Sequence, residues 1–463
     1  MHRSACGAVA ALFFAAVFVA APDDARAPAA AAVLAPGGST LADGLTVQVR
    51  QLRSSPTAAI EVWLGVPSDG YGESKPGIAR LAALAVAYEA FNGKSLRDVT
   101  RDDSGQLTIT VYPASSEIAI VVPSYDATSV ERALLDRVFH PSIDAKAFAA
   151  ARQRLAAQQA AYLGATDLVL RDAVFSALFA SGAYHVSPYG AAGSLNEISL
   201  DDLRAFLTTG YVPGNGIFVV AGDVNPAAVA RIAASRAPLP AAVTPAAPAV
   251  LSAKPGATII GNAETDRSGV ALAWAGPPIS DERAATAMDF LSDYLLRPAY
   301  GVVSMAIAAK NPGINVSGEF VTLKDPGVFY VTASGSNVDT GTMVALLRGA
   351  MTRALPGPMS ESQFARAIQA YRTHALRDNS DSAQAIADNF GWYFIHGAPA
   401  YSPSATDAAL SGDYFAQVSS LTPQYVAEVA RRYLSSAPAT AAVTPRAPAA
   451  ADVPRASPTR GGS

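Results

Sequence analysis

The sequence of 463 residues is nearly free of cysteine. Its single cysteine, Cys6, stands among the first ten residues. The body of the protein therefore cannot hold a disulfide framework, a cysteine-ligated zinc ion or a thiol nucleophile. An oxidising compartment is compatible with this composition but is not required by it.

Charged side chains are also scarce, and the two signs nearly balance. They make up 16% of the chain, 34 basic against 38 acidic residues, for a formal net charge of −4. Nucleic-acid-binding proteins usually carry a basic excess, so that class is not expected. Apolar residues make up 50% of the chain, which excludes disorder for most of it. At roughly 150 residues per domain, the length fits about three units or two large ones.

The apolar run near the N-terminus, residues 8–21, is too short to span a bilayer, because a spanning helix takes about twenty apolar residues. It follows a weakly basic start and precedes residues 25–27, whose Ala-Arg-Ala order is typical of a signal-peptide cleavage site. We predict a signal peptide over residues 1–27, with cleavage after Ala21 or Ala27. Its removal leaves no membrane span, and the mature chain is expected in the periplasm or outside the cell.

Segments rich in alanine and proline divide the rest of the chain. We predict a flexible segment over residues 28–38, a linker over 236–256 and a disordered tail over 446–463. Between them lie two bodies of similar size, an N-terminal half over 39–235 and a C-terminal half over 257–445. Equal halves suggest an internal repeat.

Similar landmarks recur in both halves. A hydroxyl residue opens a helix near the end of each, Ser199 in the first half and Thr422 in the second. Each is expected to cap the N–H groups of its first turn. An apolar strand follows each helix, at 217–221 and at 440–443.

The remaining pattern alternates grouped strands with amphipathic helices, which favours an α+β fold. Strands are predicted at 45–52, 58–66, 106–112, 117–122, 257–260, 269–275, 314–321 and 328–333. Helices are predicted at 77–91, 129–139, 145–162, 281–296, 342–354, 361–376 and 383–394.

The order of short motifs resembles the pitrilysin/insulinase family of zinc metallopeptidases, the inverzincins. The matching stretches are Thr40-Leu41-Ala42-Asp43-Gly44-Leu45-Thr46-Val47, Ser187-Pro188-Tyr189-Gly190, Leu200 with Leu203, Tyr211-Val212-Pro213-Gly214-Asn215 and Val220-Ala221-Gly222-Asp223-Val224. The resemblance covers both halves. It implies two homologous α+β halves of the LuxS/pitrilysin-like metallopeptidase type, joined by the Pro/Ala-rich linker.

The resemblance also implies a zinc site, and this chain lacks its residues. Active members carry H-x-x-E-H on a helix, with two histidine ligands and a glutamate that activates water. Here Arg80 and Leu84 stand at the histidine positions and Ala83 at the glutamate position. The third ligand, a glutamate in the family, falls near Ala157 or Gln158. Since a catalytic zinc needs three protein ligands, we expect no catalytic residue, metal or cofactor here.

The second half of an active member usually supplies an arginine and, seven residues later, a tyrosine that hold the substrate. One alignment puts Ala309 and Val316 at these positions, and a shift by one residue puts Lys310 and Ser317 there. Neither restores the pair. The resemblance therefore implies a member without the catalytic set, and activity as an enzyme is not expected.

Other residues that often carry catalysis have simpler interpretations. His140 and His185 are expected in a cap and a turn, His374 near a helix end where the dipole favours a cation, and His396 without a catalytic role. No two are at metal-binding spacing.

Asp339-Thr340-Gly341 has the spelling of an aspartic-peptidase triplet. It occurs once and precedes a predicted helix, so we interpret Asp339 as an N-cap.

Two features keep peptide binding open. Arg80 is either a solvated or ion-paired residue of a retired site or a contact for a peptide carboxylate in the former cleft. The strand with Gln106, Thr108 and Thr110 aligns with the family's substrate-pairing edge strand, which binds a peptide through main-chain hydrogen bonds. A proline at Thr110 is expected to remove one such donor.

Together these observations predict an exported, non-catalytic homologue of a zinc metallopeptidase. It is expected to serve as a structural, regulatory or peptide-binding subunit, paired with a second copy or with an active paralogue. The alternatives are a metalloendopeptidase that uses an unrecognised site and a peptide-holding module that acts alone.

Overall fold

The structure is a computed structural model that describes residues 38–71, 75–90, 93–191, 193–236, 239, 253–262, 264–265, 267–336, 338–355, 357–398 and 408–445. The predicted signal peptide and tail lie outside the described residues, as do nearly all of the flexible segment and most of the linker. Within the described ranges, no helix is both long and apolar enough to cross a membrane.

The first half builds a six-stranded sheet with the order β1-β2-β6-β3-β5-β4. Its strands are β1 (Ser39–Thr40), β2 (Thr46–Gln51), β3 (Thr57–Leu64), β4 (Gln106–Val111), β5 (Ser116–Pro123) and β6 (Gly216–Gly222). Among these pairs only β2 and β6 run parallel. We call this the N-sheet.

The second half repeats this arrangement in the five-stranded C-sheet, with the order β7-β11-β8-β10-β9. Its strands are β7 (Ala257–Asn262), β8 (Ser268–Ala275), β9 (Asn315–Val321), β10 (Val328–Gly335) and β11 (Ala439–Pro445). When the short strand β1 is left out, the strands of the two halves follow the same order, and the parallel pair β7 with β11 corresponds to β2 with β6. The structure thus confirms the predicted α+β fold of two similar halves.

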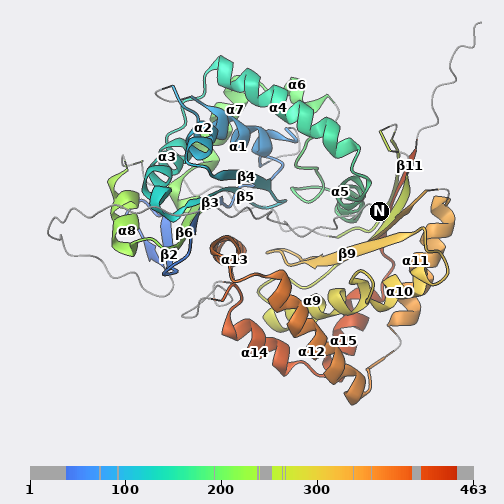
Figure 1. Ribbon diagram of the computed structural model, residues 1–463. Coiled ribbons are helices and arrows are strands. Elements are labelled where there is room, and N and C mark those ends of the chain that lie inside the picture. Colours follow the sequence, from blue (N-terminus) through green and yellow to red (C-terminus); the bar gives the residue numbers. More distant parts are fainter. Residues whose placement is uncertain are drawn as a thin grey trace, which may run out of the picture.

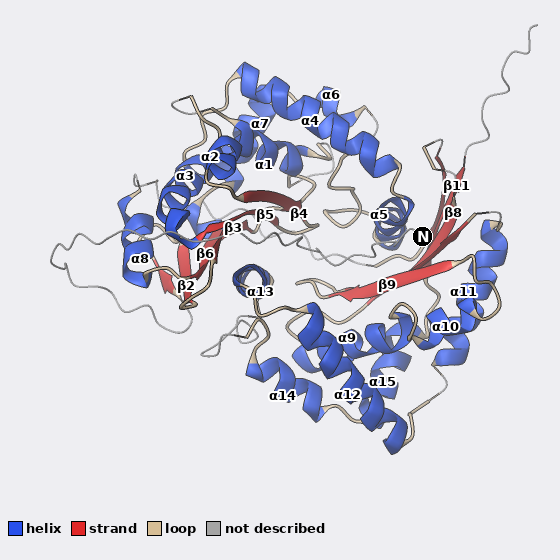
Figure 2. Ribbon diagram, viewed as in Figure 1, coloured by secondary structure: helices blue, strands red, loops and turns tan. Residues whose placement is uncertain are grey.

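Helices flank both sheets, most of them on the outer faces and two of them between the sheets (Figures 1 and 2). In the first half these are α1 (Ile78–Tyr88), α2 (Leu96–Asp102), α3 (Ala127–Phe139), α4 (Ala145–Leu163), α5 (Thr166–Leu178), α6 (Ser194–Glu197), α7 (Leu200–Gly210) and α8 (Pro226–Ser235), with short 3-10 turns at Ser124–Asp126 and Pro213–Asn215. In the second half they are α9 (Glu282–Leu296), α10 (Val302–Ala308), α11 (Thr340–Ala354), α12 (Glu361–Asp378), α13 (Ala383–Ile395), α14 (Gly412–Ser420) and α15 (Pro423–Leu434). The sequence did not predict α2, α5, α6, α8, α10 or α14.

The predicted helix caps are confirmed. The Ser199 side chain accepts a hydrogen bond from the Asp202 N–H at the start of α7, and Thr422 does the same for Tyr425 at the start of α15. Asp339 accepts from the Thr342 N–H at the start of α11, which confirms its structural role. Each cap satisfies an N–H that the first helical turn leaves without a partner.

Each half gives one helix to the sheet of the other half. The helix α13 packs on β3 and β6 of the N-sheet, while α5 packs on β8, β10 and β11 of the C-sheet. In Figure 1, α13 is seen end-on beneath the N-sheet, opposite α1, α4 and α7. These two inner helices stand between the sheets, so each half completes its core with a segment of the other.

The exchanged helices bury apolar side chains in both directions. Ile386 and Phe390 of α13 join Trp63 in one core cluster, while Leu170 and Val174 of α5 join residues of β8 and β11 in another. At roughly 25 cal/mol for each Å² of apolar surface removed from water, such contacts strongly favour the assembled form. Each sheet is built from strands of one half, and one helix of the other half packs on it.

Candidate functional site

The helix α1 carries the residues at the former zinc positions. It begins after Gly77, whose φ of 93° lies in the left-handed region that favours glycine. Arg80, in the first turn, donates from Nε to Oε1 of Gln158 on α4 at 2.7 Å. Its guanidinium lies over the Tyr189 ring, 4.4 Å from the centroid. Arg80 is thus half-buried and held by packing, rather than solvated or ion-paired as one of the two sequence interpretations had it.

The neighbouring positions also lack metal-binding atoms. Ala83 and Leu84 are buried in the apolar core, at 0% and 1% exposure. Of the two candidates for the third position, Ala157 is exposed and Gln158 is the one that contacts Arg80. Zinc does not fit these residues, because none of them offers an imidazole or carboxylate ligand.

A stack of side chains fills the space around Arg80. Tyr189 lies between the Arg80 guanidinium and Tyr162 in this stack. The centroids of the Tyr189 and Tyr162 rings are 4.5 Å apart, and the ring planes differ by 19°. Burial lowers the pKa of the Arg80 guanidinium. It remains charged at neutral pH, since an arginine side chain does not lose its proton in a protein. A fixed cation therefore stands at the position where the sequence resemblance implies a histidine ligand.

Ser187, the first residue of the Ser-Pro-Tyr-Gly motif, fastens this region to α5. Its hydroxyl donates to Oδ2 of Asp172 at 2.7 Å, and Asp172 forms an ion pair with Arg171 at 2.9 Å. The motif that carries the resemblance therefore has a structural contact in this chain.

The positions for the substrate-holding pair are likewise not rebuilt. Ala309 and Lys310 are exposed residues at the end of α10. Val316 is buried in the core of the second half, and Ser317 lies in the wall of the cavity described below.

The histidines lie in separate surroundings. His140 is the C-cap of α3, and His185 contacts the Phe179 carbonyl at 2.8 Å. His396 is buried, which lowers its pKa to about 4, and its Nδ1 contacts the Trp392 carbonyl at 2.9 Å. His374 lies one turn before the end of α12 and faces Asp293 of α9 at 3.0 Å.

A cavity of about 1250 Å³ lies between the two halves. Its walls come from the two exchanged helices, from the edge strand β9 and from the helices of the second half. Its charged lining residues are Asp167, Arg171, Glu264, Arg267, Asp289, Asp293, Arg297, Glu319 and Asp378. The cavity has the size and the mixed lining of a ligand site.

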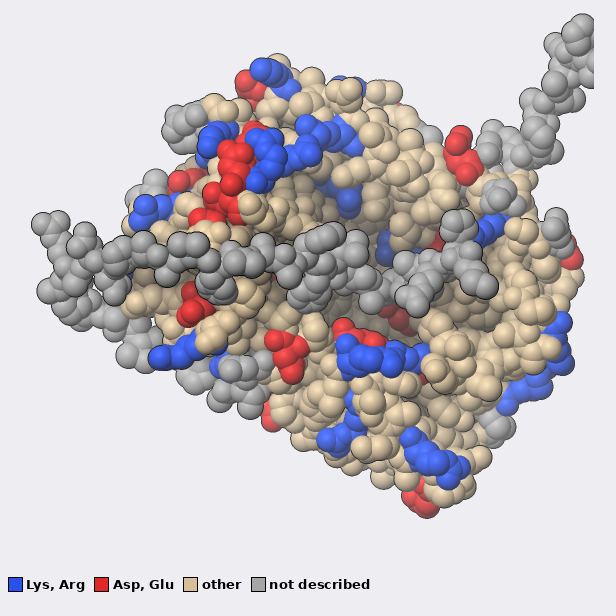
Figure 3. All heavy atoms as spheres, in the orientation of Figure 1, with Lys and Arg blue, Asp and Glu red and all other residues tan. Residues whose placement is uncertain are grey.

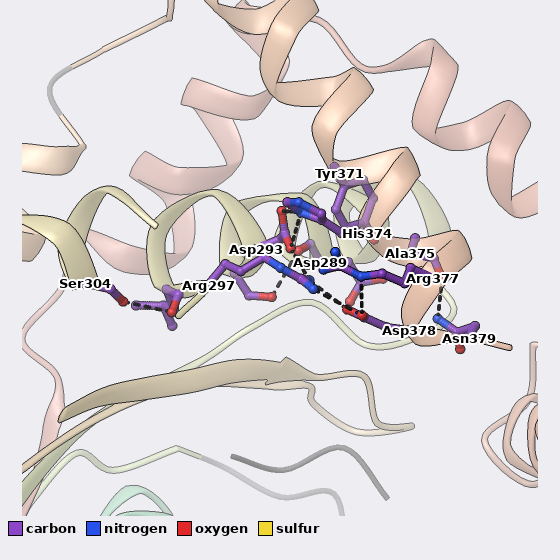
Figure 4. A network of polar contacts seen from close by, with 12 residues as sticks. Asp289, Asp293, Arg297, Ser304, Tyr371, His374, Ala375, Arg377, Asp378 and Asn379 are labelled. Atoms are coloured by element: carbon purple, nitrogen blue, oxygen red, sulfur yellow. Dashed lines mark hydrogen bonds and ion pairs between the residues drawn. The ribbon is translucent and has the colours of Figure 1, made fainter. Parts of the chain in front are cut away.

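One wall of this cavity is a polar network on α9 and α12 (Figure 4). Arg297 binds Asp293 at 2.9 Å and Asp378 at 2.7 Å, and the Asp293 carboxylate also faces His374. These pairs tie the ends of the two helices together. Figure 3 shows that basic and acidic side chains alternate over this face of the molecule, without a large patch of one sign.

Deeper in the same wall, Asp289 lies among hydroxyl groups. Tyr414 donates to its Oδ2 at 3.1 Å and Thr322 to its Oδ1 at 3.2 Å. The Tyr371 and Tyr414 hydroxyls share a further hydrogen bond. Burial raises the pKa of Asp289 to about 7.

The predicted edge strand is at the edge. β4 ends the N-sheet and has β5 as its one neighbour among the described strands. The Thr108 and Thr110 side chains line a smaller cavity of about 150 Å³ between the N-sheet and α13. Asn389 and Trp392 line both cavities, so the strand faces the space between the halves.

The register shows which main-chain groups of β4 are free to pair. Tyr112 donates to the Ser115 carbonyl at 2.8 Å, which makes these two a hydrogen-bonded pair of the ladder. Because such pairs alternate along antiparallel strands, Thr110 pairs with β5 while Ile109 directs its N–H and C=O away from the sheet. Thr110 therefore has no outward donor to lose, and the proline test suggested from sequence belongs at Ile109.

The sequence analysis did not identify three carboxylates that lie where α13 meets the N-sheet. Glu61 of β3, Glu117 of β5 and Asp388 of α13 form the group of potential metal ligands that the described part of the chain contains. One signal was present, because Glu61 interrupts an otherwise apolar strand, 58–66. That Asp388 lies against this strand could not be predicted from the sequence pattern, because the two are far apart in the chain.

Comparisons with known proteins agree with this geometry. The Peptidase M16 inactive domain model matches residues 197–371. A protease from Helicobacter pylori has a TM-score of 0.77 at 18% identity, with 88% of this chain and 97% of that chain covered. A peptidase M16 inactive domain from Pseudomonas fluorescens has a TM-score of 0.74 at 17% identity, over 88% and 97%. A chain of complex III2 from Candida albicans gives 0.70 at 14% identity, over 87% and 94%.

A search of the curated proteins found no match. The solved structures are too distant in sequence to transfer a function, and they show that the fold is shared over nearly the whole described chain. The relation to the peptidase family rests on the domain match, the motif order and the loss of the zinc ligands. The match of residues 197–371 to the Peptidase M16 inactive domain, the M16-like fold and the missing zinc ligands together support a degenerate, non-catalytic, peptidase-like homologue of the pitrilysin/insulinase (M16) family.

Proposed function

We propose that the protein is an exported, non-catalytic subunit that binds extended peptides between its halves and pairs with a second copy or with an active paralogue. The observation that carries this proposal is the position of β4. Among the described strands β4 pairs only with β5, so the main-chain groups of its other edge pair with none of them, and its Thr108 and Thr110 side chains face the cavity between α13 and the N-sheet. An edge strand of this kind binds a peptide by adding it as a further strand.

The packing around Arg80 supports a role without catalysis. The side chain is held by Gln158 and Tyr189, so the former metal position is filled by a stable contact. A peptide bound along β4 would meet no activated water there. Stoichiometric zinc together with chelator-sensitive cleavage of unstructured peptides would contradict this part of the proposal.

Peptide binding is tested by Ile109→Pro, which removes an outward N–H but leaves the ladder with β5 intact. The matched control is Ile109→Ala, which also shortens the side chain but keeps the N–H. Fluorescence anisotropy with a labelled, unstructured peptide is expected to show several-fold weaker binding for the proline variant only. Equal affinity for both variants would count against β4 as the binding strand.

Pairing is tested by purification from the native host at low salt. The complex III2 chain of similar fold belongs to a multi-subunit assembly, and this supports an assembly here too. We expect the protein to elute with an intact H-x-x-E-H relative or as a dimer, as measured by light scattering and mass spectrometry. Recovery as a free monomer alone would contradict the pairing.

Export is tested by N-terminal sequencing of the protein from fractionated cells. We expect a mature chain that begins after Ala21 or Ala27, outside the cytoplasm. An uncleaved chain confined to the cytoplasm would contradict the expected signal peptide.

A further inference from the structure

The contact between α13 and the N-sheet holds three carboxylates that come from distant parts of the chain. Glu61 lies on β3, Glu117 on β5 and Asp388 on α13, and one carboxylate oxygen of each lies within 4.8 Å of the others. None of the three belongs to the former zinc site, whose residues lie on α1 and α4.

The sheet register explains why two of them meet. Trp63 pairs with Glu117 across the two strands, and Glu61 lies two residues before Trp63 on the same face. Diagonal neighbours of this kind are within reach of long side chains. The helix α13 packs on this face of the sheet and adds Asp388 from the other half.

The negative charge of this group is not balanced by a protein cation. None of the ion pairs formed by the described residues includes Glu61, Glu117 or Asp388. Two unit charges about 4 Å apart repel by roughly 4 kcal/mol at an effective dielectric constant of about 20. Three carboxylates at this spacing stay together only if protons or a bound cation offset their charge.

Glu61 provides a second and separate indication. Its side chain is fully buried, at 0% exposure, and Trp63 Nε1 donates to its Oε2 at 2.8 Å. The other oxygen, Oε1, is also buried and has no hydrogen-bond partner among the described residues. A buried carboxylate oxygen without a partner is costly, and the groups next to it are the two other carboxylates, which offer no donor when ionised.

We propose that Glu61, Glu117 and Asp388 bind one hard divalent cation of the calcium and magnesium class, which ties the second half to the N-sheet. All three ligands are carboxylate oxygens, the donors that these ions prefer over nitrogen and sulfur. The adjoining cavity of about 150 Å³, lined by Glu117 and Asp388, has room for the waters that complete the coordination. The ion would link β3, β5 and α13 at a single point.

The full mature chain can report on such an ion directly. Tb³⁺ replaces Ca²⁺ at oxygen sites and emits when a nearby aromatic ring is excited, and here Trp63 is hydrogen-bonded to a ligand and stacks on Tyr112 at 5.7 Å. After treatment with a chelator and buffer exchange, we expect saturable Tb³⁺ emission at one ion per chain. Added CaCl₂ or MgCl₂ should displace it, and the same salts should raise the melting temperature.

The test variant is Asp388→Asn, which keeps the shape of the least buried of the three ligands. The matched control is Asp413→Asn, which removes the same charge from an exposed position at the start of α14. We expect Asp388→Asn to weaken Ca²⁺ binding by more than about tenfold, because it removes one charged ligand of three. Asp413→Asn should bind as the native chain does.

A second variant, Glu117→Gln, keeps the test decisive if the first changes the fold as judged by circular dichroism. The proposal is overturned if the native chain shows no aromatic-sensitised Tb³⁺ emission and no rise in melting temperature with CaCl₂ or MgCl₂. It is also overturned if folded Asp388→Asn or Glu117→Gln binds Ca²⁺ with unchanged affinity. None of these outcomes depends on peptide binding, so they are independent of the proposed function.

Discussion

The two exchanged helices make similar contacts with opposite electrostatics. The sixth residue of α5 is Arg171, and the sixth residue of α13 is Asp388. Arg171 pairs with Asp172 of its own helix, whose charge raises the pKa of the guanidinium. Asp388 instead faces Glu61 and Glu117, and no protein cation pairs with them in the described ranges. At the α5 contact, Asp172 neutralises the charge of Arg171. At the α13 contact, only protons or a bound cation can neutralise the three carboxylates.

The difference shows that a duplicated fold constrains backbone packing more than charge. Both helices lie on the inner face of the opposite sheet and bury apolar side chains there. Either type of charged centre fits within such a frame if it is compensated, because the apolar contacts around it supply most of the binding free energy.

The largest effect is expected from a methyl group at Gly391 of α13. The added Cβ would overlap the buried Trp63 indole, which cannot move without breaking its bond to Glu61. We expect Gly391→Ala to lower the free energy of unfolding by about 3 kcal/mol, as overpacking of a tight core does. Urea unfolding measures this.

The control is Gly412→Ala, since nothing lies within 4 Å of a Cβ added there. It should change stability by less than about 0.5 kcal/mol. An equally stable Gly391→Ala variant would show that α13 does not rest on Trp63.

The next comparison removes a charge from each contact in metal-free protein. Arg171→Met leaves Asp172 without its ion pair and should destabilise the fold by about 1–2 kcal/mol, a value reduced because the arginine is one-third exposed. Asp388→Asn relieves repulsion and should stabilise the metal-free fold by about 1 kcal/mol. Urea unfolding in the presence of chelator gives both values. Changes of the same sign would remove the contrast between the two contacts.

The pH dependence of the metal-free protein sharpens the same contrast. Burial and the charge of neighbouring carboxylates raise the pKa of Glu61 and Glu117 well above 4.5. The folded state then binds more protons than the unfolded state, so stability is highest below about pH 4.5 for these groups and falls as the pH rises through their folded-state pKa. The slope is at most about 1.4 kcal/mol per pH unit for each proton.

Asp289 contributes in the same direction, because its pKa of about 7 is also raised, and its part is lost between about pH 4 and 7. Asp289→Asn separates this contribution from that of the α13 contact. The measurement is urea unfolding of chelator-treated protein between pH 5 and 8, for the native chain and for Asp388→Asn. A slope that Asp388→Asn does not reduce would place the titration elsewhere.

The smallest effect is expected at the former zinc position. Arg80→Met removes a cation–π contact with Tyr189 and a hydrogen bond to Gln158, for a loss of about 1 kcal/mol. Arg80→Lys should recover part of it. Urea unfolding and elemental analysis check the pair, and zinc bound by either variant would contradict the absence of ligands there.

Much of the fold was readable from local signals. Ser199, Asp339 and Thr422 cap helices because a side-chain oxygen in front of an apolar period satisfies the first-turn donors. Strand alternation placed β4 and its neighbours correctly, and the motif order predicted the family. The missed helices were short or, like α5, depend on burial against the other half.

The candidate site was only partly accessible in the same way. The loss of ligands at Arg80, Ala83 and Leu84 is a statement about residue types at fixed spacing, so the sequence sufficed. The orientation of Thr110 toward β5 was not predictable, since the hydrogen-bonding phase of a strand depends on its turn and its partner.

The sequence by itself determined most strands and the longer capped helices, the repeat of the halves and the residue types at the zinc positions, because each of these depends on residues close together in the chain. Only the tertiary structure decided that α5 and α13 each pack on the sheet of the other half and that Glu61, Glu117 and Asp388 lie close together. Periodicity shows which face of an element is buried but not which distant segment covers it. The charge balance of the molecule's interior depends on that choice of partner.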